Sequence, residues 1–101
     1  MYGTVARYRL KPGMEGQLIE LAREFKAAQV PGFVASYAYR MDADPNNYYI
    51  AVVFESREAY VANADSPEQD ARYRQMLSLL EHAPEWHDGE IVYALPVPAT
   101  R

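Results

Sequence analysis

One stretch of the chain, residues 48–55, constrains the fold more than any other because it is apolar on both faces. It is β-branched in the middle and is followed by Ser56, which can cap a helix, so it predicts a buried strand that runs into a helix. Successive side chains of a strand point to opposite faces. One face therefore carries Ile50, Val52 and Phe54, and the other carries Tyr49, Ala51 and Val53. Neither face suits water, so both need a cover.

The length of the chain limits what can cover these two faces. The protein has 101 residues, and we expect one domain over residues 1–95 and a tail over residues 96–101. A domain of this size leaves much of its surface outside, yet half of the residues are hydrophobic. Helices of the same chain can cover one face of a sheet. A second copy of the chain is the expected cover for the other face, which predicts a homodimer.

Strand and helix patterns follow one another in a recognisable order. Alternating side chains predict strands over 2–10, 33–41 and 90–95 besides the stretch above, with a turn at 86–89. Helical spacing of apolar residues predicts helices from residue 14 to about 30, over 56–65, and from 67 to about 82. The clearest local signal is Ser66-Pro67, a capping residue followed by proline at the first helical position. This order predicts an α+β, ferredoxin-like split βαβ domain: a four-stranded antiparallel sheet with its helices on one face.

Composition excludes several classes of function. The net charge of −4 does not favour nucleic acid or an anionic membrane as a partner, and the absence of cysteine excludes disulfides and thiolate chemistry. His82 and His87 lack metal-ligand spacing, and the five glycines are too dispersed to form a phosphate loop. No apolar run approaches the roughly 20 residues that cross a bilayer, and the amino terminus enters a strand pattern directly. We therefore expect no metal, no cofactor and a cytoplasmic location.

Four short motifs spread over most of the domain carry a family resemblance. They are Ala6-Arg7-Tyr8 followed by Lys11-Pro12-Gly13, then Pro31-Gly32-Phe33, then Phe54-Glu55-Ser56-Arg57-Glu58-Ala59-Tyr60, then Ser66-Pro67. With them the sequence resembles the antibiotic biosynthesis monooxygenase family of dimeric α/β barrels. The resemblance implies two sheets packed face to face in a dimer and a ligand cleft between the helices and the sheet of each subunit. It does not extend to haem degradation, because the first-strand asparagine of haem-degrading relatives falls on Ala6.

Tyrosines are the first set of candidate binding residues. Phenols offer an apolar wall and a hydroxyl that orients a ligand, which suits a small, flat, apolar or aromatic molecule. The tyrosines expected to line the helix–sheet cleft or the dimer barrel are Tyr8, Tyr37, Tyr39, Tyr60 and Tyr73. The competing interpretation is that they are core residues whose hydroxyls are satisfied at the rim.

Candidate catalytic residues follow from what oxidation of a phenol without a prosthetic group requires. Such an enzyme deprotonates the substrate, holds the electron-rich anion near oxygen and stabilises its charge. Asn63 and Tyr73 are the expected donors to a developing oxyanion, His82 the expected proton acceptor and Trp86 the expected stacking wall. His82 is also typical of a solvated residue at a helix end, and Trp86 of a plug in a dimer interface.

Two functions remain open on these residues. The first is a cofactor-independent monooxygenase acting on a small aromatic, polyketide-like compound. The second is a non-catalytic ligand-binding or stress-associated dimeric α/β barrel. Arg7, Arg9 and Arg40 are expected on strand faces that meet in the dimer, either paired with Glu55 or Glu90 or acting as an anion clamp.

Overall fold

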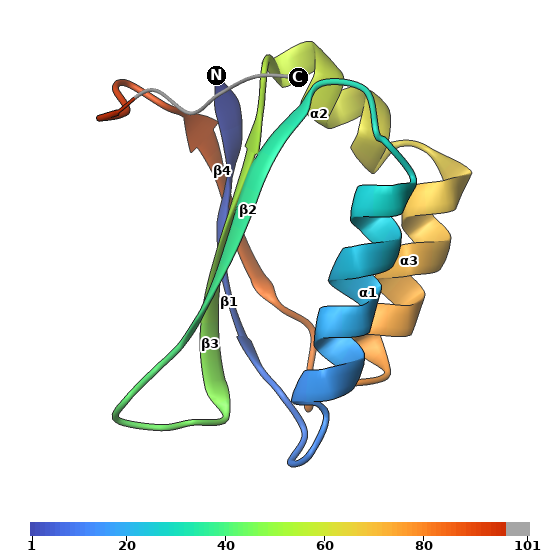
Figure 1. The fold of residues 1–101 in the computed structure, drawn as a ribbon, viewed down its shortest axis with the longest axis vertical. Helices are drawn as coiled ribbons and strands as arrows, with labels where there is room; N and C mark the ends of the chain where they lie inside the picture. The colour runs from blue at the N-terminus through green and yellow to red at the C-terminus, as the bar shows by residue number, and fades with distance from the viewer. Residues whose placement is uncertain (97–101) are drawn as a thin grey trace.

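The protein is a single sheet with helices on one side. The computed structural model describes residues 1–96. The elements are β1 (Tyr2–Arg9), α1 (Glu15–Ala27), β2 (Phe33–Arg40), β3 (Asn47–Phe54), α2 (Arg57–Ala64), α3 (Pro67–Leu77) and β4 (Glu85–Glu90). The strands form an antiparallel sheet in the order β2-β3-β1-β4, and the helices lie to one side of it (Figure 1). The expected α+β ferredoxin-like fold is confirmed.

The starts of α2 and α3 follow local signals in the sequence. The side-chain oxygen of Ser56 accepts a hydrogen bond from the Ala59 amide, and that of Ser66 accepts one from the Gln69 amide, both at 3.1 Å. Each serine satisfies a backbone amide that the first turn of a helix leaves without a partner. Pro67 occupies the first turn of α3, where its missing amide hydrogen costs nothing.

The fourth strand differs from the sequence prediction. The segment 86–89, expected to be a turn, lies within β4, and the predicted strand at 90–95 lies almost entirely beyond it. The reason is the length of β1, which is the one strand beside β4 in the described part of the chain: its first residue, Tyr2, pairs with Glu90. After one further hydrogen bond, from the Ile91 amide to the Met1 carbonyl at 3.0 Å, no neighbouring strand within residues 1–96 continues the pairing. Alternating side chains over residues 90–95 would suit a strand, but β1, the strand with which they would pair, does not extend past Tyr2.

The end of α3 is the second departure. The helix was expected to run to about residue 82 but ends at Leu77. Residues 78–81 turn back along the end of β1. The Lys11 amide donates a hydrogen bond to the Leu79 carbonyl at 2.8 Å, and Leu80 forms an isolated antiparallel β-bridge with Leu10. Burial of Leu79 and Leu80 in the core offsets the loss of the last helical turn.

The face of the sheet that no helix covers is apolar over most of β2 and β3 and at Val5 of β1, and it carries Arg7, Glu85 and His87 toward one end of β1 and β4. Register places on it the side chains of Val5, Ala35, Tyr37, Tyr39, Tyr49, Ala51 and Val53. Tyr37 and Tyr39 are 52% and 58% exposed. The expectation of a bare face is therefore confirmed for the described residues. The predicted tail lies outside them except for Pro96, and the domain boundary at residue 95 stays a prediction.

Candidate functional site

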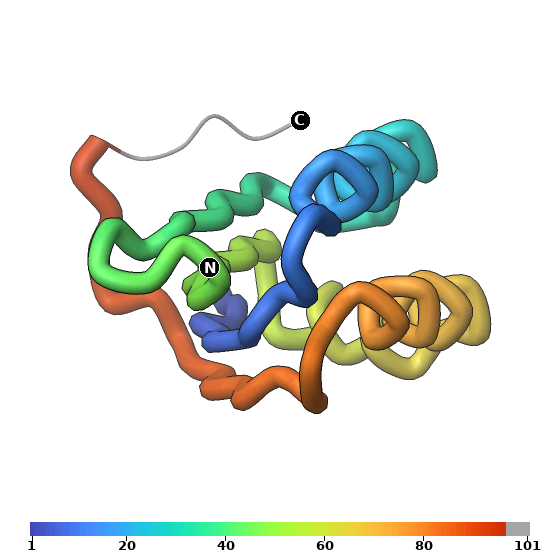
Figure 2. The backbone as a smooth tube through the Cα atoms, turned by 90° about the horizontal axis from the view of Figure 1, so that it is seen from below, coloured from blue at the N-terminus to red at the C-terminus, as the bar shows by residue number. Residues whose placement is uncertain are grey.

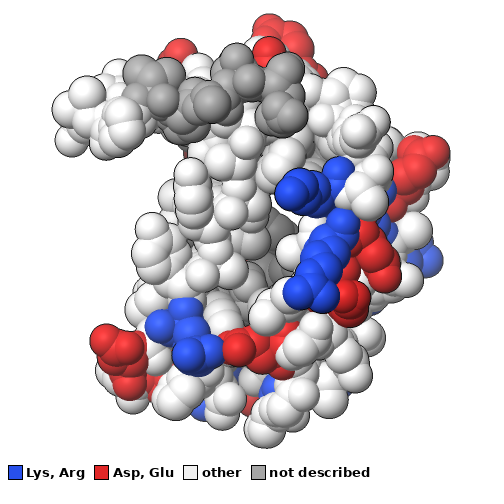
Figure 3. All heavy atoms as spheres, viewed as in Figure 1, with Lys and Arg blue, Asp and Glu red and all other residues white. Residues whose placement is uncertain are grey.

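A cleft lies between the helices and the middle of the sheet. No residue of the three helices is fully buried, and the helix-facing side chains in the middle of β2 and β3 (Ser36, Ala38, Ile50 and Val52) remain exposed or half-buried. Figure 2 shows the two layers with α1 and α3 side by side, and Figure 3 shows a hollow between the helices and the sheet. We call this space the helix–sheet cleft. Its sheet side is formed by Thr4, Ala6, Ser36, Ala38, Ile50 and Val52.

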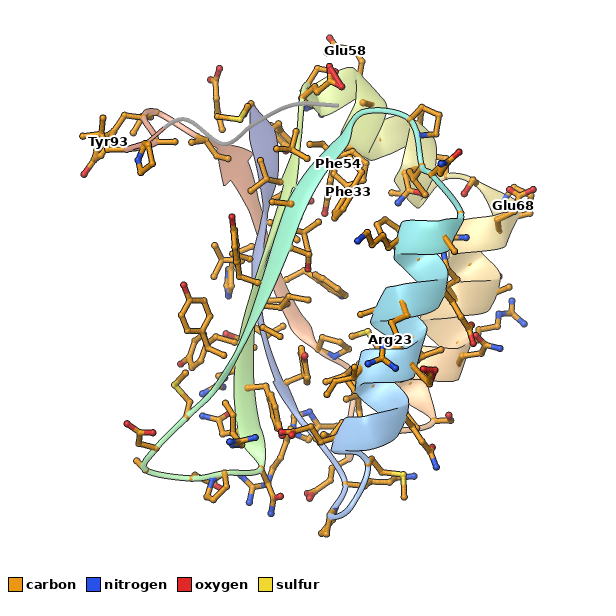
Figure 4. The ribbon with its side chains drawn as sticks, viewed as in Figure 1. Arg23, Phe33, Phe54, Glu58, Glu68 and Tyr93 are labelled. Carbon is orange, nitrogen blue, oxygen red and sulfur yellow. The ribbon has the colours of Figure 1, made fainter. Side chains whose placement is uncertain are left out.

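Packed side chains close both ends of the cleft. At one end Tyr8 stacks on Tyr48 with ring centroids 5.7 Å apart, within the leucine-rich core. At the other end five aromatic rings form a continuous row with centroid separations of 5.3, 5.6, 5.8 and 4.9 Å. The row runs Tyr2, Tyr60, Phe54, Phe33, Phe25. Figure 4 shows two neighbouring members of the row, Phe33 and Phe54, lying together between the sheet and α2.

Asn63 lies at the aromatic end in contact with a guanidinium. Arg72 on α3 directs Nη2 at the Asn63 Oδ1 atom, 3.5 Å away, and donates from Nε to the Gln69 Oε1 atom at 3.0 Å. Its guanidinium carbon lies 5.2 Å from the centroid of the Phe25 ring. Among the described residues Arg72 forms no ion pair. A half-buried positive charge is therefore held beside Asn63, whose amide nitrogen remains available as a donor.

Tyr73 and Trp86 form a second aromatic wall. Pairing of Trp86 with Ala6 turns the indole toward the helices, and its ring centroid lies 6.1 Å from that of Tyr73. This contact exists because the segment expected to be a turn is a strand. The structure therefore brings two predicted site residues together.

Tyr60 makes a hydrogen bond across the cleft to a residue that the sequence predictions did not include. Its hydroxyl donates to the Asp88 Oδ1 atom at 2.8 Å. Burial, with a further effect of the Asp88 carboxylate, raises the pKa of Tyr60 to about 12. The tyrosine therefore keeps its proton at neutral pH and acts as a donor.

The other predicted tyrosines divide between the two faces of the sheet. Tyr8 is 1% exposed at the closed core end, and burial raises its pKa to about 12. Tyr37 and Tyr39 lie on the opposite face, where they can line a dimer barrel but not the helix–sheet cleft. Of the five tyrosines, only Tyr60 and Tyr73 border the cleft directly.

The structure does not bring His82 to the other candidate catalytic residues. Asn63 precedes α3 and His82 follows it, and the 11 residues of this helix span about 16 Å. The exposed His82 ring forms a hydrogen bond with the neighbouring Ala83 carbonyl, at 3.1 Å, and His82 lines a polar cavity beside Arg7 and Arg9. His87 faces the uncovered side of the sheet, where it pairs with Glu85 at 3.0 Å. Neither histidine faces the cleft, and residues 1–96 contain no cluster of three metal-ligating side chains.

The arginine partners differ from those expected. Arg7 pairs with Glu85 at 3.4 Å and Arg40 with Glu15, whereas neither Glu55 nor Glu90 takes part. Arg9 pairs with Asp44 and Glu81. A polar cavity of about 420 Å³ beside Arg7 and Arg9 is thus lined by arginines that already have carboxylate partners. The strand arginines form ion pairs, which leaves no free cation for an anion clamp among them.

Sequence reasoning missed Arg72, Thr4 and Asp88. Arg72 directly precedes Tyr73, and this place beside the apolar stripe of α3 was the one available signal. Thr4 and Asp88 are paired across β1 and β4, a relation that depends on sheet register. No local pattern carries that register.

The fold and the cleft define a small ferredoxin-like α+β protein with a cleft between its two layers. Residues 1–75 match the family described as antibiotic biosynthesis monooxygenase, and the chain belongs to this family. No match was found among curated proteins. No helix in the described part of the chain is long and apolar enough to cross a membrane.

Solved structures of several bacterial proteins share the fold. SnoaB, a cofactor-independent oxygenase from Streptomyces nogalater, superposes with a TM-score of 0.76 at 19% identity, covering 95% of this chain and 97% of that one. An asparagine-to-alanine variant of SnoaB gives a TM-score of 0.78 at 19% identity, with the same coverage. A Chloroflexus aurantiacus protein, provisionally described as an antibiotic biosynthesis monooxygenase, gives 0.73 at 25% identity, covering 92% of this chain and 94% of that one.

Proposed function

We propose that this protein is a cofactor-independent monooxygenase that oxidises a small aromatic, polyketide-like compound in the helix–sheet cleft. The observation that carries the proposal is the arrangement of Asn63 and Arg72 at the aromatic end of the cleft. A donor and a cation held beside flat apolar walls suit an electron-rich aromatic anion. Family membership supports the reaction type, and the description of SnoaB as a cofactor-independent oxygenase agrees with it.

Oxidation of an anthrone by O₂ requires few catalytic groups from the protein. An anthrone consumes one O₂: its methylene carbon loses two hydrogens and becomes a carbonyl, and the second oxygen atom leaves as water. The protein's part is to bind the ring system, favour its anion and exclude bulk water. Tyr73 and Trp86 supply a wall for the rings, and the Asn63 amide with the Arg72 guanidinium stabilises the negative oxygen.

A homodimer belongs to the proposal. The uncovered face of the sheet presents exposed tyrosines and valines, and a second copy is the cover that the family resemblance implies. The segment after β4 adds more apolar surface, with Val92 and Leu95 89% and 86% exposed. Light scattering at micromolar concentration should give the mass of two chains, and a monomer would contradict the assembly.

Oxygen uptake with an anthrone tests the reaction. We expect Asn63→Ala to lower kcat by about 10²-fold, the usual effect of losing one oxyanion donor. We expect Tyr73→Phe to have a smaller effect, because the ring wall remains. Tyr93→Phe is the matched control, since Tyr93 projects away from the helices (Figure 4). Uptake equal to the blank over a panel of anthrones, with the wild-type protein, would refute the proposal.

A second candidate function is a non-catalytic ligand-binding or stress-associated dimer. The observation that favours it is that both histidines lie outside the cleft, so the residues commonest in proton transfer are absent from it. Saturable binding of an aromatic ligand without oxygen uptake would identify this function.

A further inference from the structure

The hydroxyl of Thr4 is buried in the sheet side of the cleft without a hydrogen-bond partner. Thr4 is 5% exposed, and its Oγ1 atom reaches no partner among the described residues. Burying a hydroxyl in this way costs free energy, and a valine of the same shape would avoid that cost. The unpaired oxygen therefore calls for a partner that the chain itself does not supply.

Two polar groups adjoin this hydroxyl. Asp88 on β4 pairs directly with Thr4 on β1, so both side chains point to the helix side of the sheet. Tyr60 reaches down from α2 and donates to Asp88 at 2.8 Å. The Thr4 hydroxyl interacts with the Tyr60 hydroxyl and opposes the rise in the pKa of Tyr60 that burial causes, but the two groups do not meet the distance and angle of a hydrogen bond. Trp86 lies two residues before Asp88 on the same face, about 7 Å along the strand. The three groups therefore adjoin the wall that Trp86 and Tyr73 form.

We propose that Thr4, Tyr60 and Asp88 form a subsite that binds a hydroxyl group of the aromatic substrate and accepts its proton. The inference rests on the proposed function, since it supplies the proton acceptor that His82 was expected to be. Thr4 Oγ1 hydrogen-bonds the substrate and Tyr60 relays the proton. Asp88 is the final acceptor because its exposed carboxylate can return the proton to water.

The step balances without any change of oxidation state. The O–H bond of the substrate, which in an anthrone is that of its enol tautomer, breaks, and its proton bonds to the Tyr60 oxygen. The Tyr60 O–H bond breaks at the same time, and that proton bonds to the Asp88 Oδ1 atom. The substrate keeps the electron pair and becomes the phenolate that reacts with oxygen.

The surroundings favour Asp88 over the other carboxylate that accepts from a cleft tyrosine. Glu15 accepts from both Tyr48 and Arg40, and these hydrogen bonds lower its pKa, which makes it a weaker base. Asp88 accepts from Tyr60 and forms no ion pair within residues 1–96. Titratable groups on the neighbouring strands are Tyr2 from β1, whose ring packs on Tyr60, and Glu90 from β4, two residues along the same face.

Thermal unfolding of Thr4→Val tests the unpaired hydroxyl without any ligand. We expect the Tm to rise by about 4–8 °C, because one buried unsatisfied group is removed from a domain of this size. The Tm of Asp88→Asn should stay near that of wild type, since its side chain is exposed. A fall in Tm for Thr4→Val would show that the hydroxyl is already satisfied and would overturn the subsite.

Kinetics and binding test the proton transfer. With anthrone we expect Asp88→Asn to lower kcat by about 10²-fold or more and leave KM unchanged. Tyr60→Phe should lower kcat similarly. Glu90→Gln is the matched control, since it removes the same charge two residues away on the same face, and it should behave as wild type. Asp88→Asn with wild-type kcat would overturn the relay while leaving the proposed function standing.

A ligand that cannot turn over separates the two proposals. 1,8-Dihydroxyanthraquinone carries a carbonyl where an anthrone carries its methylene group, so it should bind without reaction. We expect Thr4→Val to weaken its binding about threefold to tenfold, the effect of one lost hydrogen bond. If the wild-type protein shows no oxygen uptake, the proposed function and the relay both fail. If Thr4→Val and the wild-type protein bind 1,8-dihydroxyanthraquinone with equal affinity, the hydroxyl-binding subsite fails as well.

Discussion

The two stacked tyrosines at the core end of the cleft should respond in opposite ways to loss of the hydroxyl. Tyr8 is 1% exposed, and its hydroxyl has no hydrogen-bond partner among the described residues. Tyr48 is also buried, but its hydroxyl donates to the Glu15 Oε1 atom at 2.5 Å. Phenylalanine keeps both rings, which lie 3° from parallel, so each substitution isolates one hydroxyl.

The magnitude for Tyr8→Phe follows from the cost of an unsatisfied buried group, about 1–3 kcal/mol. We expect the free energy of unfolding to rise by about 1 kcal/mol, the low end of this range, because small movements relieve part of the cost. For a domain of this length the Tm should then rise by about 4–8 °C. Tyr48→Phe should lower stability instead, because it breaks the bond to Glu15 and leaves Arg40 as the remaining donor to that carboxylate.

Urea unfolding at neutral pH measures both effects, with the slope m checked to be unchanged. An alkaline series adds a second readout, since the folded pKa of Tyr8 is about 12 and the unfolded value is about 10. Below pH 10 the Tyr8 phenol is protonated in both the folded and the unfolded state. Between pH 10 and 12 it ionises only in the unfolded state, so the free energy of unfolding of the wild-type protein falls by up to about 1.4 kcal/mol per pH unit because of this group. Tyr8→Phe should lose less over that window. Lower stability of Tyr8→Phe at neutral pH would refute the reasoning.

Two further expectations concern the scaffold. Gly32 has a φ of +79°, and a Cβ there would lie 2.5 Å from the Ala59 Cβ. Gly32→Ala should therefore lower the free energy of unfolding, measured in urea, by about 2 kcal/mol or more. A variant as stable as the wild-type protein would contradict the expected backbone strain and steric clash. A hydrogen bond from Arg9 lowers the pKa of Asp44 in the folded protein. The ionised Asp44 therefore stabilises the fold above its unfolded pKa near 4, and this stabilisation is lost as the pH falls through the folded pKa. Asp44→Asn should make the free energy of unfolding fall less steeply with acid, and an unchanged pH profile of stability would count against the ion pair.

Local sequence signals determined the order of the elements and where several of them begin. Ser56 and Ser66 cap helices within three residues of themselves, and alternation along β1 and β3 separates the two faces of each strand. These features depend on side chains close together in the chain, and so periodicity and capping residues predicted them. The fold class followed from the resulting order of strands and helices.

Only the tertiary structure decided which side chains meet in the cleft. The place of β4 depends on where β1 begins, so Trp86 and Asp88 were expected in a turn but lie in a strand facing the helices. The contact of Arg72 with Asn63 and the burial of Thr4 likewise depend on how α2, α3 and the sheet pack. Register and packing join residues far apart in sequence, and no local pattern records the distance between them.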